Sequence, residues 1–409
     1  MKHLWYGLMI SLTLLSCGKK APTDDQLKDF CRNVGFAINE LNDSNEQSNT
    51  FLKAAKKSEA SYDIRKITPE QIDLLFEDGG SALDMHLRKW LSPILKQKAE
   101  KEGTIYAYYY WKYYPADIYN PVRPADEVEV FKTLLSKDDL STFIEQTPEA
   151  GKEIVTEAAR INAKQWTEFG MIPYVKSLLT YPLSNQAIEK TVQIFNTAFV
   201  GEISQADKEE IRKQVLSLYE KLAKETTTPS QKKRAEAQIA YLQSAFATGT
   251  LVGNKAPELH FQWISNGKEK TLDDFKGKVV MLDFWATKCE PCVKSFPEMA
   301  KLQEHYRNSN VAIIGVTSVQ GYFVDTPNGK VVNTENDPKK EMSLMPAYMK
   351  GMGINWRIAF TEEDVMNVEY GVLAIPHITL IDKEGKVRYN NITGTNEEKI
   401  KLIDSLLNE

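Results

Sequence analysis

The chain has 409 residues, of which 42% are hydrophobic, and a formal net charge of −5 at pH 7. This length exceeds that of one compact domain, and the hydrophobic fraction suffices for two cores. Because no broad basic field accompanies this charge balance, composition argues against nucleic acid as a partner.

The chain starts with a short basic segment and an apolar run over residues 4–15, and then reads Leu14-Leu-Ser-Cys17. These features resemble a bacterial lipoprotein signal peptide. The apolar run is too short to span a bilayer. The resemblance implies removal of residues 1–16 and lipid modification of Cys17, the alternative being an ordinary signal peptide with a coincidental cysteine. It implies a lipid-anchored chain in the cell envelope, facing the periplasm or the exterior, and Gly18 weakly favours the outer membrane.

Helical signals dominate residues 17–248. Ser204-Gln-Ala-Asp207 is typical of a helix start, and apolar residues then recur at helical spacing. The next predicted helix, about Ser230–Ala247, ends at Thr248-Gly249-Thr250, where strand and turn patterns begin. We therefore predict an all-α N-terminal domain at 17–248, which includes the lipidated tether. No repeat of fixed period is evident, and a tetratricopeptide-type solenoid stays an open alternative.

Two features of this region carry no assigned chemistry. Cys31 is predicted to be a buried, small apolar residue. The run Ile105–Tyr114 is rich in aromatic side chains, which cannot all face one way on a helix. Interhelical or interdomain packing is one explanation for the run, and a partner- or glycan-binding surface is the other.

The pair Cys289 and Cys292 lies in Trp285-Ala-Thr-Lys-Cys289-Glu-Pro-Cys292, between an apolar strand and an amphipathic helix. Two cysteines three residues apart in this context indicate a thiol–disulfide redox site. Unpaired N–H groups and the positive dipole end at the helix start favour a Cys289 thiolate, whose pKa should fall. One helical turn separates the cysteines, so a disulfide can close between them.

Strands and helices alternate from residue 253 onward, which predicts an α/β domain at 253–409 with a mixed sheet flanked by helices. The predicted elements are a strand pair around Asn266-Gly267, strands at 279–285, 311–317 and 357–360, helices at 290–306, near 345–352, near 363–370 and at 396–407, and a hairpin of 377–382 with 387–389. The intervening segment 320–343 is predicted to contain a projecting hairpin of 322–324 with 330–332. Shaping access to the dithiol and a tolerated surface elaboration are equal alternatives for it.

Residues 253–409 contain an ordered set of motifs, which are Gly253-Asn-Lys-Ala-Pro257, Phe275-Lys-Gly-Lys278, Phe284–Cys292, Pro297 and Ile375-Pro376. In this order they resemble a thioredoxin-fold domain of the TlpA/ResA family. The resemblance implies a cis Ile375–Pro376 peptide that faces the cysteines, where the backbone pairs with an extended client segment.

Residue roles follow from these positions and from the resemblance. Cys289 is expected to be exposed and to attack the client disulfide, and Cys292 to resolve the mixed disulfide. Asp283 is predicted to accept the Cys292 proton, the alternative being a hydrogen bond to a nearby backbone group or exposure to solvent. The predicted catalytic residues are thus Cys289, Cys292, Asp283 and Pro376. The predicted client contacts are Trp285, Lys288, Ile375 and Pro376.

Three residues depart from the family pattern. Lys288 stands where Trp is usual, and its charge should favour the Cys289 thiolate while Glu290 opposes it. Ser295 replaces an acid of the ResA branch, which makes Asp283 the better candidate acid. His377 stands where Thr is common, but the ligand set around it is too small for a metal site, so neither a metal nor a cofactor is predicted.

The sequence thus predicts an envelope thiol–disulfide oxidoreductase that reduces client disulfides. The reductive direction, the disulfide-containing or thiol clients and a membrane thiol reductase as electron donor are what the resemblance implies. A disulfide oxidase or isomerase is the alternative within the enzyme class, and a peroxiredoxin fits less well because the two cysteines lie too close together. A scaffold or binding lipoprotein with a vestigial redox domain is the alternative from another class.

Overall fold

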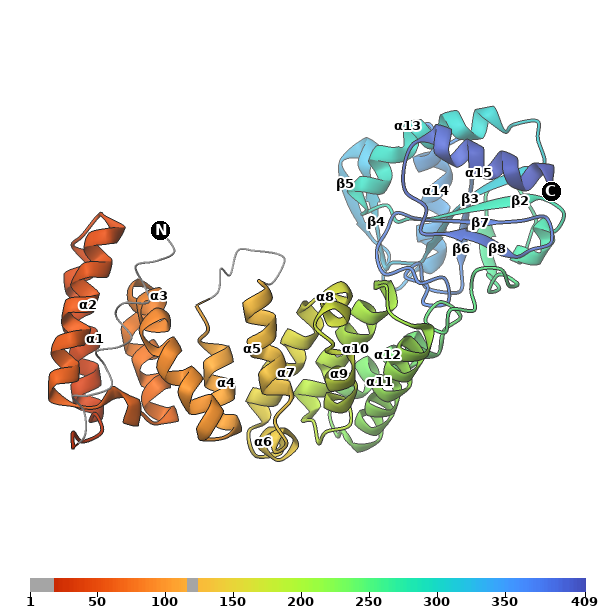
Figure 1. Cartoon of the computed structure of the whole chain (residues 1–409). Coiled ribbons are helices and arrows are strands. Elements are labelled where there is room, and N and C mark those ends of the chain that lie inside the picture. The colour runs from red at the N-terminus through yellow and green to blue at the C-terminus, as the bar shows by residue number, and fades with distance from the viewer. Residues whose placement is uncertain (1–17, 116–123) are drawn as a thin grey trace. The chain divides into compact units, whose positions relative to one another are not determined.

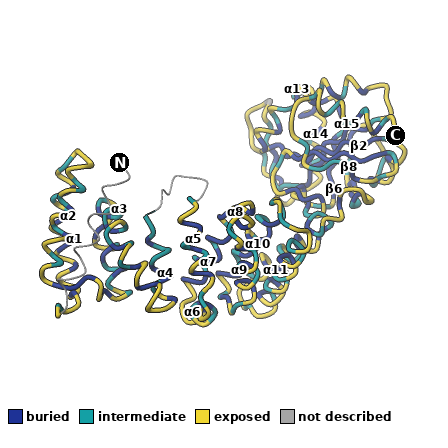
Figure 2. Tube along the Cα trace, viewed as in Figure 1, coloured by how far each residue is buried: buried dark blue, intermediate teal, exposed yellow. Residues whose placement is uncertain are grey.

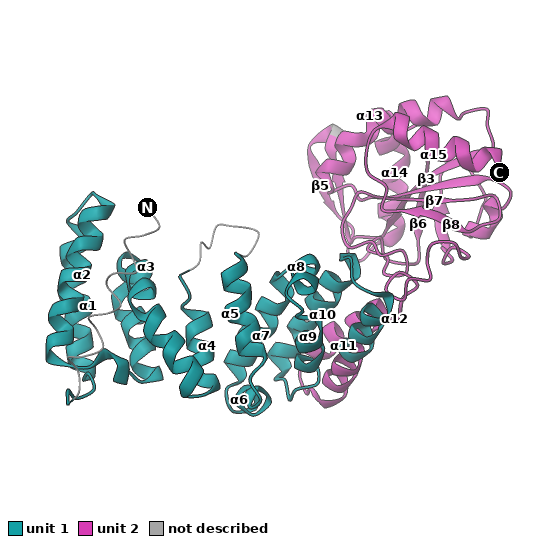
Figure 3. Ribbon diagram, in the orientation of Figure 1, with its two compact units in different colours: residues 1–215 teal, residues 216–409 magenta. Residues whose placement is uncertain are grey.

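A computed structural model describes residues 18–115 and 124–409, so the signal peptide predicted at 1–16 and the lipidation site predicted at Cys17 lie outside the described residues. The chain divides into two compact units, Met1–Val215 and Leu216–Glu409 (Figure 3). This division falls within helix α11 (Gln205–Glu225). The domain boundary predicted between 248 and 253, where helices give way to strands, stays a prediction.

The described part of the first unit is helical, as predicted (Figure 1). Its helices before α11 are α1 (Asp24–Asn39), α2 (Ser44–Ser61), α3 (Pro69–Lys101), α4 (Thr104–Lys112), α5 (Ala125–Leu135), α6 (Leu140–Gln146), α7 (Pro148–Arg160), α8 (Ala163–Glu168), α9 (Ile172–Leu178) and α10 (Asn185–Val200), with a 3₁₀ turn η1 at Ile64–Lys66. Within the described part of the chain, no helix combines the length and the apolar character needed to cross a membrane.

Local sequence explains why these helices form where they do. At the start of α1, the Thr23 hydroxyl accepts the Gln26 N–H while the Gln26 side chain accepts the Thr23 N–H, which is a capping box. Along α3, leucines recur every four residues and are fully buried at Leu83, Leu87, Leu91 and Leu95. Each contributes roughly 1.5–3 kcal/mol by leaving water, so this stripe fixes the buried face of α3.

The aromatic run at 105–114 is used for interhelical packing. From α4, the Tyr108 hydroxyl donates to Glu153 of α7 at 2.7 Å. The Tyr113 hydroxyl donates to Asp73 of α3 at 2.7 Å, and Tyr109 donates to the same carboxylate. These rings are buried, so the packing alternative is confirmed for them. Cys31 is buried as predicted.

The second unit contains a mixed sheet, as predicted, and this sheet has six strands. Its elements after α11 are α12 (Pro229–Gln243), β1 (Phe261–Ile264), η2 (Leu272–Phe275), β2 (Val279–Phe284), α13 (Glu290–His305), β3 (Val311–Ser318), β4 (Tyr322–Asp325), η3 (Thr326–Asn328), β5 (Lys330–Asn333), α14 (Pro338–Met352), β6 (Arg357–Thr361), β7 (His377–Ile381), β8 (Val387–Asn390) and α15 (Asn396–Asn408). The strand order is β1-β6-β3-β2-β7-β8, in which β2 pairs parallel with β3 and antiparallel with β7. The hairpin predicted at 322–324 and 330–332 is confirmed as the separate pair β4–β5, but it packs against the domain instead of projecting from it.

The central strand β2 separates two hydrophobic clusters. Met281 and Trp285 face one cluster, whereas Leu282 and Phe284 face the other, because side chains alternate along a strand. Helices α13, α14 and α15 cover the first cluster, and η2 with irregular segments covers the second. The sheet is therefore buried on both faces, which Figure 2 shows as a dark band through this unit.

Four predicted elements differ from the observed ones. Of the strand pair predicted around Asn266-Gly267, only β1 is a strand: it pairs antiparallel with β6, and an isolated bridge between His260 and Thr271 takes the place of the predicted pairing. Helix α14 begins at Pro338 rather than near 345, because the Asp337 side chain accepts the Lys340 N–H and caps the helix there. The helix predicted near 363–370 is wrong: the Asn367 side chain accepts the N–H groups of Glu369 and Tyr370, which makes a turn instead. Helix α12 ends at Gln243, before the predicted Ala247.

Gly371, which precedes the cis-proline segment, cannot carry a side chain without a clash. Its φ is +67°, and a Cβ there would lie 2.3 Å from the Phe246 ring. We expect Gly371→Ala to destabilise this part of the sheet by about 2–4 kcal/mol, because backbone strain and overpacking add. Hydrogen exchange of the β7 amides measures this loss.

Gly385→Ala is the matched control for that experiment. Gly385 also has a positive φ, +82°, but a Cβ there would have no neighbour within 4 Å. It should lose only the strain contribution, about 1–2 kcal/mol. Equal exchange rates in the two variants would contradict the predicted contribution of Phe246.

Candidate active site

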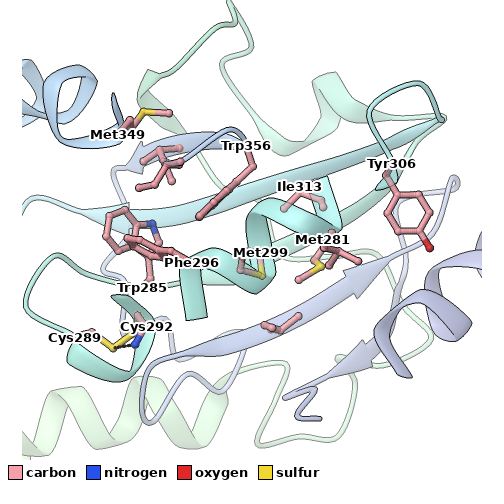
Figure 4. Packing of buried hydrophobic residues seen from close by; sticks show 14 of the residues in the cluster. Met281, Trp285, Cys289, Cys292, Phe296, Met299, Tyr306, Ile313, Met349 and Trp356 are labelled. Atoms are coloured by element: carbon pink, nitrogen blue, oxygen red, sulfur yellow. Dashed lines mark hydrogen bonds between the residues drawn. A yellow bond between two sulfur atoms is a disulfide. The ribbon is translucent and has the colours of Figure 1, made fainter. Parts of the chain in front are cut away.

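A disulfide joins Cys289 and Cys292 at the start of α13, with their Cα atoms 5.2 Å apart (Figure 4). Cys289 is the N-cap residue of the helix, and Pro291 occupies its first turn. The Cys292 N–H donates to Cys289 Sγ at 3.2 Å. A backbone donor at a helix N-terminus therefore points at the Cys289 sulfur, and this arrangement would stabilise a thiolate there after reduction.

The prediction that Cys289 is exposed is wrong for this disulfide form. Its relative exposure is 8%, against 1% for Cys292. The loop before β7 covers it, since Cys289 Sγ lies 3.6 Å from the carbonyl oxygen of Ile375. Cys289 is nevertheless the more exposed of the two cysteines.

The Ile375–Pro376 peptide bond is cis, as the resemblance implies. Strand pairing brings it to the dithiol, because His377 of β7 lies opposite Phe284 at the end of β2. Pro376 is exposed and Ile375 half-buried. The backbone of this loop is therefore both next to Cys289 and open to solvent.

Trp285, predicted to contact the client, is fully buried, which corrects that prediction. Its ring packs edge-to-face on Phe296 (Figure 4). The same ring stacks on Tyr348. Gly315 on the neighbouring strand makes room for it, because a Cβ there would lie 2.8 Å from the indole nitrogen. The Trp285 ring thus packs in the core next to the redox loop and exposes no surface for contact with a client.

Asp283 lies inside the protein on the same side of the sheet as both cysteines. It points to the same face of the sheet as Met281 and Trp285, because side chains two residues apart along a strand share a face, and its relative exposure is 2%. Burial raises the pKa of Asp283 from 3.8 to about 7, and the charge of Lys399 on α15 opposes this rise. The exposed-to-solvent alternative for Asp283 is wrong, and its carboxyl changes charge near neutral pH.

His377 and Ser295 take structural places next to the dithiol. The buried His377 ring packs edge-to-face on Phe284, and its Nε2 is 3.0 Å from Asn390 Oδ1. Burial lowers the pKa of His377. The Ser295 hydroxyl donates to the Cys292 carbonyl at 2.7 Å, within its own helix. In the residues that the structure describes, His, Cys, Asp and Glu side chains form no group of three that could hold a metal ion.

Sequence reasoning missed the contact between the redox loop and the β4–β5 hairpin. The Val324 N–H donates to Thr287 Oγ1 at 3.2 Å, two residues before Cys289. The Lys288 ammonium, predicted to contact the client, lies 5.2 Å from the centre of the Tyr322 ring. The sequence shows only that Thr287, a residue with a hydroxyl group, follows a buried strand. This does not identify Val324 as its hydrogen-bond partner.

A disulfide at a helix start, a cis-proline loop against it and a buried acid on the central strand of a mixed sheet define a thioredoxin-fold redox protein. Residues 251–407 match the Redoxin family. Thiol-disulfide oxidoreductase ResA of Bacillus subtilis (strain 168) is 33% identical over 149 residues, which are 36% of this chain and 70% of the relative. ResA of Geobacillus thermodenitrificans (strain NG80-2) is 33% identical over 155 residues, 38% of this chain and 76% of the relative.

Among solved structures, a putative thiol-disulfide oxidoreductase from Bacteroides vulgatus is 24% identical, with a TM-score of 0.29, over 38% of this chain and 97% of that one. From its sequence relatives, the chain belongs to the TlpA/ResA family of thioredoxin-like proteins and is a thiol–disulfide oxidoreductase. The individual roles predicted for Cys289, Cys292, Asp283 and Pro376 stay predictions.

Proposed function

We propose that this chain reduces disulfide bonds of client proteins through the Cys289/Cys292 dithiol. The observation that carries the proposal is the contact between Cys289 Sγ and the Ile375 carbonyl, which places the sulfur of the more exposed cysteine against an exposed cis-proline loop. A client strand paired to the backbone of that loop would present its own disulfide to Cys289.

The exchange proceeds in two steps. The Cys289 thiolate attacks one sulfur of the client disulfide, the client S–S bond breaks, and a mixed disulfide forms while the client's second sulfur leaves as a thiolate and is protonated. Cys292 then attacks the Cys289 sulfur and releases the client as a dithiol. Two electrons pass to the client, and the Cys289–Cys292 disulfide of the structure is the product.

Asp283 is proposed to accept the proton that Cys292 loses in the second step, directly or through one water molecule. Two observations support this role. The carboxyl lies on the face of the sheet that carries both cysteines, and its pKa of about 7 lets it take up a proton near neutral pH. Fully charged surface carboxylates, with pKa values near 4, would be much weaker bases.

We further propose that the chain works in the cell envelope, attached by a lipid on Cys17, with a membrane thiol reductase as its electron donor. The signal-like residues 1–16 support the location. The half-buried Ile375, the exposed Pro376 and the exposed Lys288 form the proposed client-contact surface. The client is a protein with a disulfide in an extended segment.

The reduction potential of the Cys289/Cys292 pair tests the direction of electron flow. The full chain is equilibrated in defined thiol–disulfide buffers, and mass spectrometry of the peptide that carries both cysteines gives the oxidised fraction. A value near that of thioredoxin, roughly −270 mV, is expected of a reductant, and one near −120 mV would make the chain an oxidant. Failure to detect a reversible couple would favour the scaffold alternative.

A further inference from the structure

The β4–β5 hairpin is fixed against the redox loop rather than projecting freely. Phe323 of β4 is 1% exposed and packs edge-to-face on Tyr348, inside the cluster that contains both cysteines. Next to it, the Val324 N–H donates to Thr287 Oγ1. The buried ring thus holds β4 against α14, and the hydrogen bond joins β4 to the segment that carries Cys289.

A buried carboxylate holds the base of the same hairpin. Glu341 of α14 is 2% exposed and accepts the N–H groups of Gln320 at 2.8 Å and Gly321 at 3.0 Å. It also accepts the Thr334 hydroxyl at 2.7 Å, on the far side of the hairpin. The segments before β4 and after β5 therefore both bind the Glu341 side chain, which fixes the position of the hairpin.

The strand order determines on which side of the dithiol the β4–β5 hairpin lies. In the sheet, β2 lies between β3 and β7. The cis-proline loop enters β7, and the β4–β5 hairpin follows β3. A client segment over Cys289 therefore has the Ile375–Pro376 loop on one side and the hairpin on the other.

Lys288 is the charged group that the hairpin holds at this position. Its ammonium lies over the Tyr322 ring, a cation–π arrangement. The neighbouring acid, Glu290, is already paired with Lys294 at 2.7 Å, and this pairing lowers the pKa of Glu290. In the part of the chain that the structure describes, Lys288 itself has no carboxylate within ion-pair distance.

We propose that Lys288 is a specificity-determining residue, positioned by Tyr322, which selects clients that carry an acidic side chain next to the cysteine that Cys289 attacks. This inference rests on the proposed exchange through Cys289. An aromatic face leaves the charge of Lys288 available, since the ring does not neutralise it, and fixes its direction toward the hairpin side of the client. An acidic client residue on that side would complete the ion pair that the chain itself lacks.

Two synthetic peptides that differ in one residue test this selection. Each contains one disulfide in an extended segment, with either Glu or Lys beside the attacked cysteine. The value of kcat/KM is measured for the full, reduced chain with each peptide. In the ratio of the two values, any effect of a substitution on the reactivity of Cys289 cancels, because both peptides react with the same thiolate. We expect the Glu peptide to be preferred about fivefold to tenfold at low ionic strength, and this preference to shrink at high salt.

Lys288→Gln should bring that ratio close to one. Lys301→Gln is the matched control, because it also removes one lysine charge, but from a residue within α13 that is paired with Glu298 and lies away from the redox loop. This control should keep the preference of the parent chain. Tyr322→Leu should lower the ratio and Tyr322→Phe should retain it, because phenylalanine keeps the ring face but not the hydroxyl.

Equal rates with both peptides in the parent chain, or a preference that persists in Lys288→Gln, would overturn the inference. So would identical ratios in Tyr322→Leu and Tyr322→Phe, which would remove the positioning role of the ring. Failure of the proposed function gives a different result, because the parent chain would then reduce neither peptide.

Discussion

Replacing Cys292 with alanine is expected to convert the chain into a trap for its clients. Cys289 can still attack a client disulfide, but the intramolecular thiol that releases the client is gone. An external thiol must replace a group held one helical turn away, so the lifetime of the mixed disulfide should increase by about a thousandfold or more. Non-reducing electrophoresis after acid quenching, followed by mass spectrometry of the joined peptides, measures this accumulation.

Cys289→Ala with Cys292→Ala is the control for the trap. The double variant keeps Cys31, which is 2% exposed, and therefore shows whether any other thiol captures clients. It should capture none. A scaffold would bind the same proteins in both variants without a covalent bond, and that outcome would refute the exchange mechanism.

Replacing Asp283 with asparagine should slow the release of the client about a hundredfold at pH 7–8, because the second step loses its proton acceptor. The carboxyl accepts a proton only when it is ionised, and its pKa is about 7. The single-turnover rate of the parent chain should therefore rise with pH through about 7, and the variant should lack this inflection. Stopped-flow fluorescence over a range of pH values distinguishes the two.

Asp283→Asn should slow the reaction but raise the stability of the fold at pH 8. Because the pKa of Asp283 is raised from 3.8 to about 7 on folding, the folded chain binds this proton more tightly than the unfolded chain. The resulting stability is fully present below about pH 4 and is lost as pH rises to about 7, by up to about 4 kcal/mol. Asp283→Asn should escape this loss and unfold at higher urea concentration than the parent at pH 8.

Asp382→Asn is the matched control for the rate measurement. Asp382 is also buried, but its carboxylate accepts the N–H groups of Glu384 and Lys386 in the β7–β8 turn. Its replacement should leave the inflection of the rate near pH 7 in place. An inflection that also persists in Asp283→Asn would show that another group accepts the proton.

Local patterns were sufficient for most of the C-terminal elements. The apolar runs at 279–285 and 311–317 became β2 and β3, because a run buried on both faces depends little on its partners. The β4–β5 and β7–β8 hairpins also follow from local sequence, since turn residues set their register. The helix predicted near 363–370 does not form, because the Asn367 side chain accepts hydrogen bonds from the N–H groups of Glu369 and Tyr370 and stabilises a turn instead.

The sequence by itself determined the dithiol at a helix start and the mixed sheet, because spacing and periodicity within a short segment encode each of them. The place of the proline loop beside the cysteines came from the family resemblance. Only the tertiary structure decided how open each side chain is. It buried Trp285 beneath the redox loop, covered Cys289 with the Ile375 carbonyl and set Lys288 over Tyr322. Exposure and pairing depend on segments far apart in the chain that meet only when the sheet closes, and no local pattern records which of them will meet.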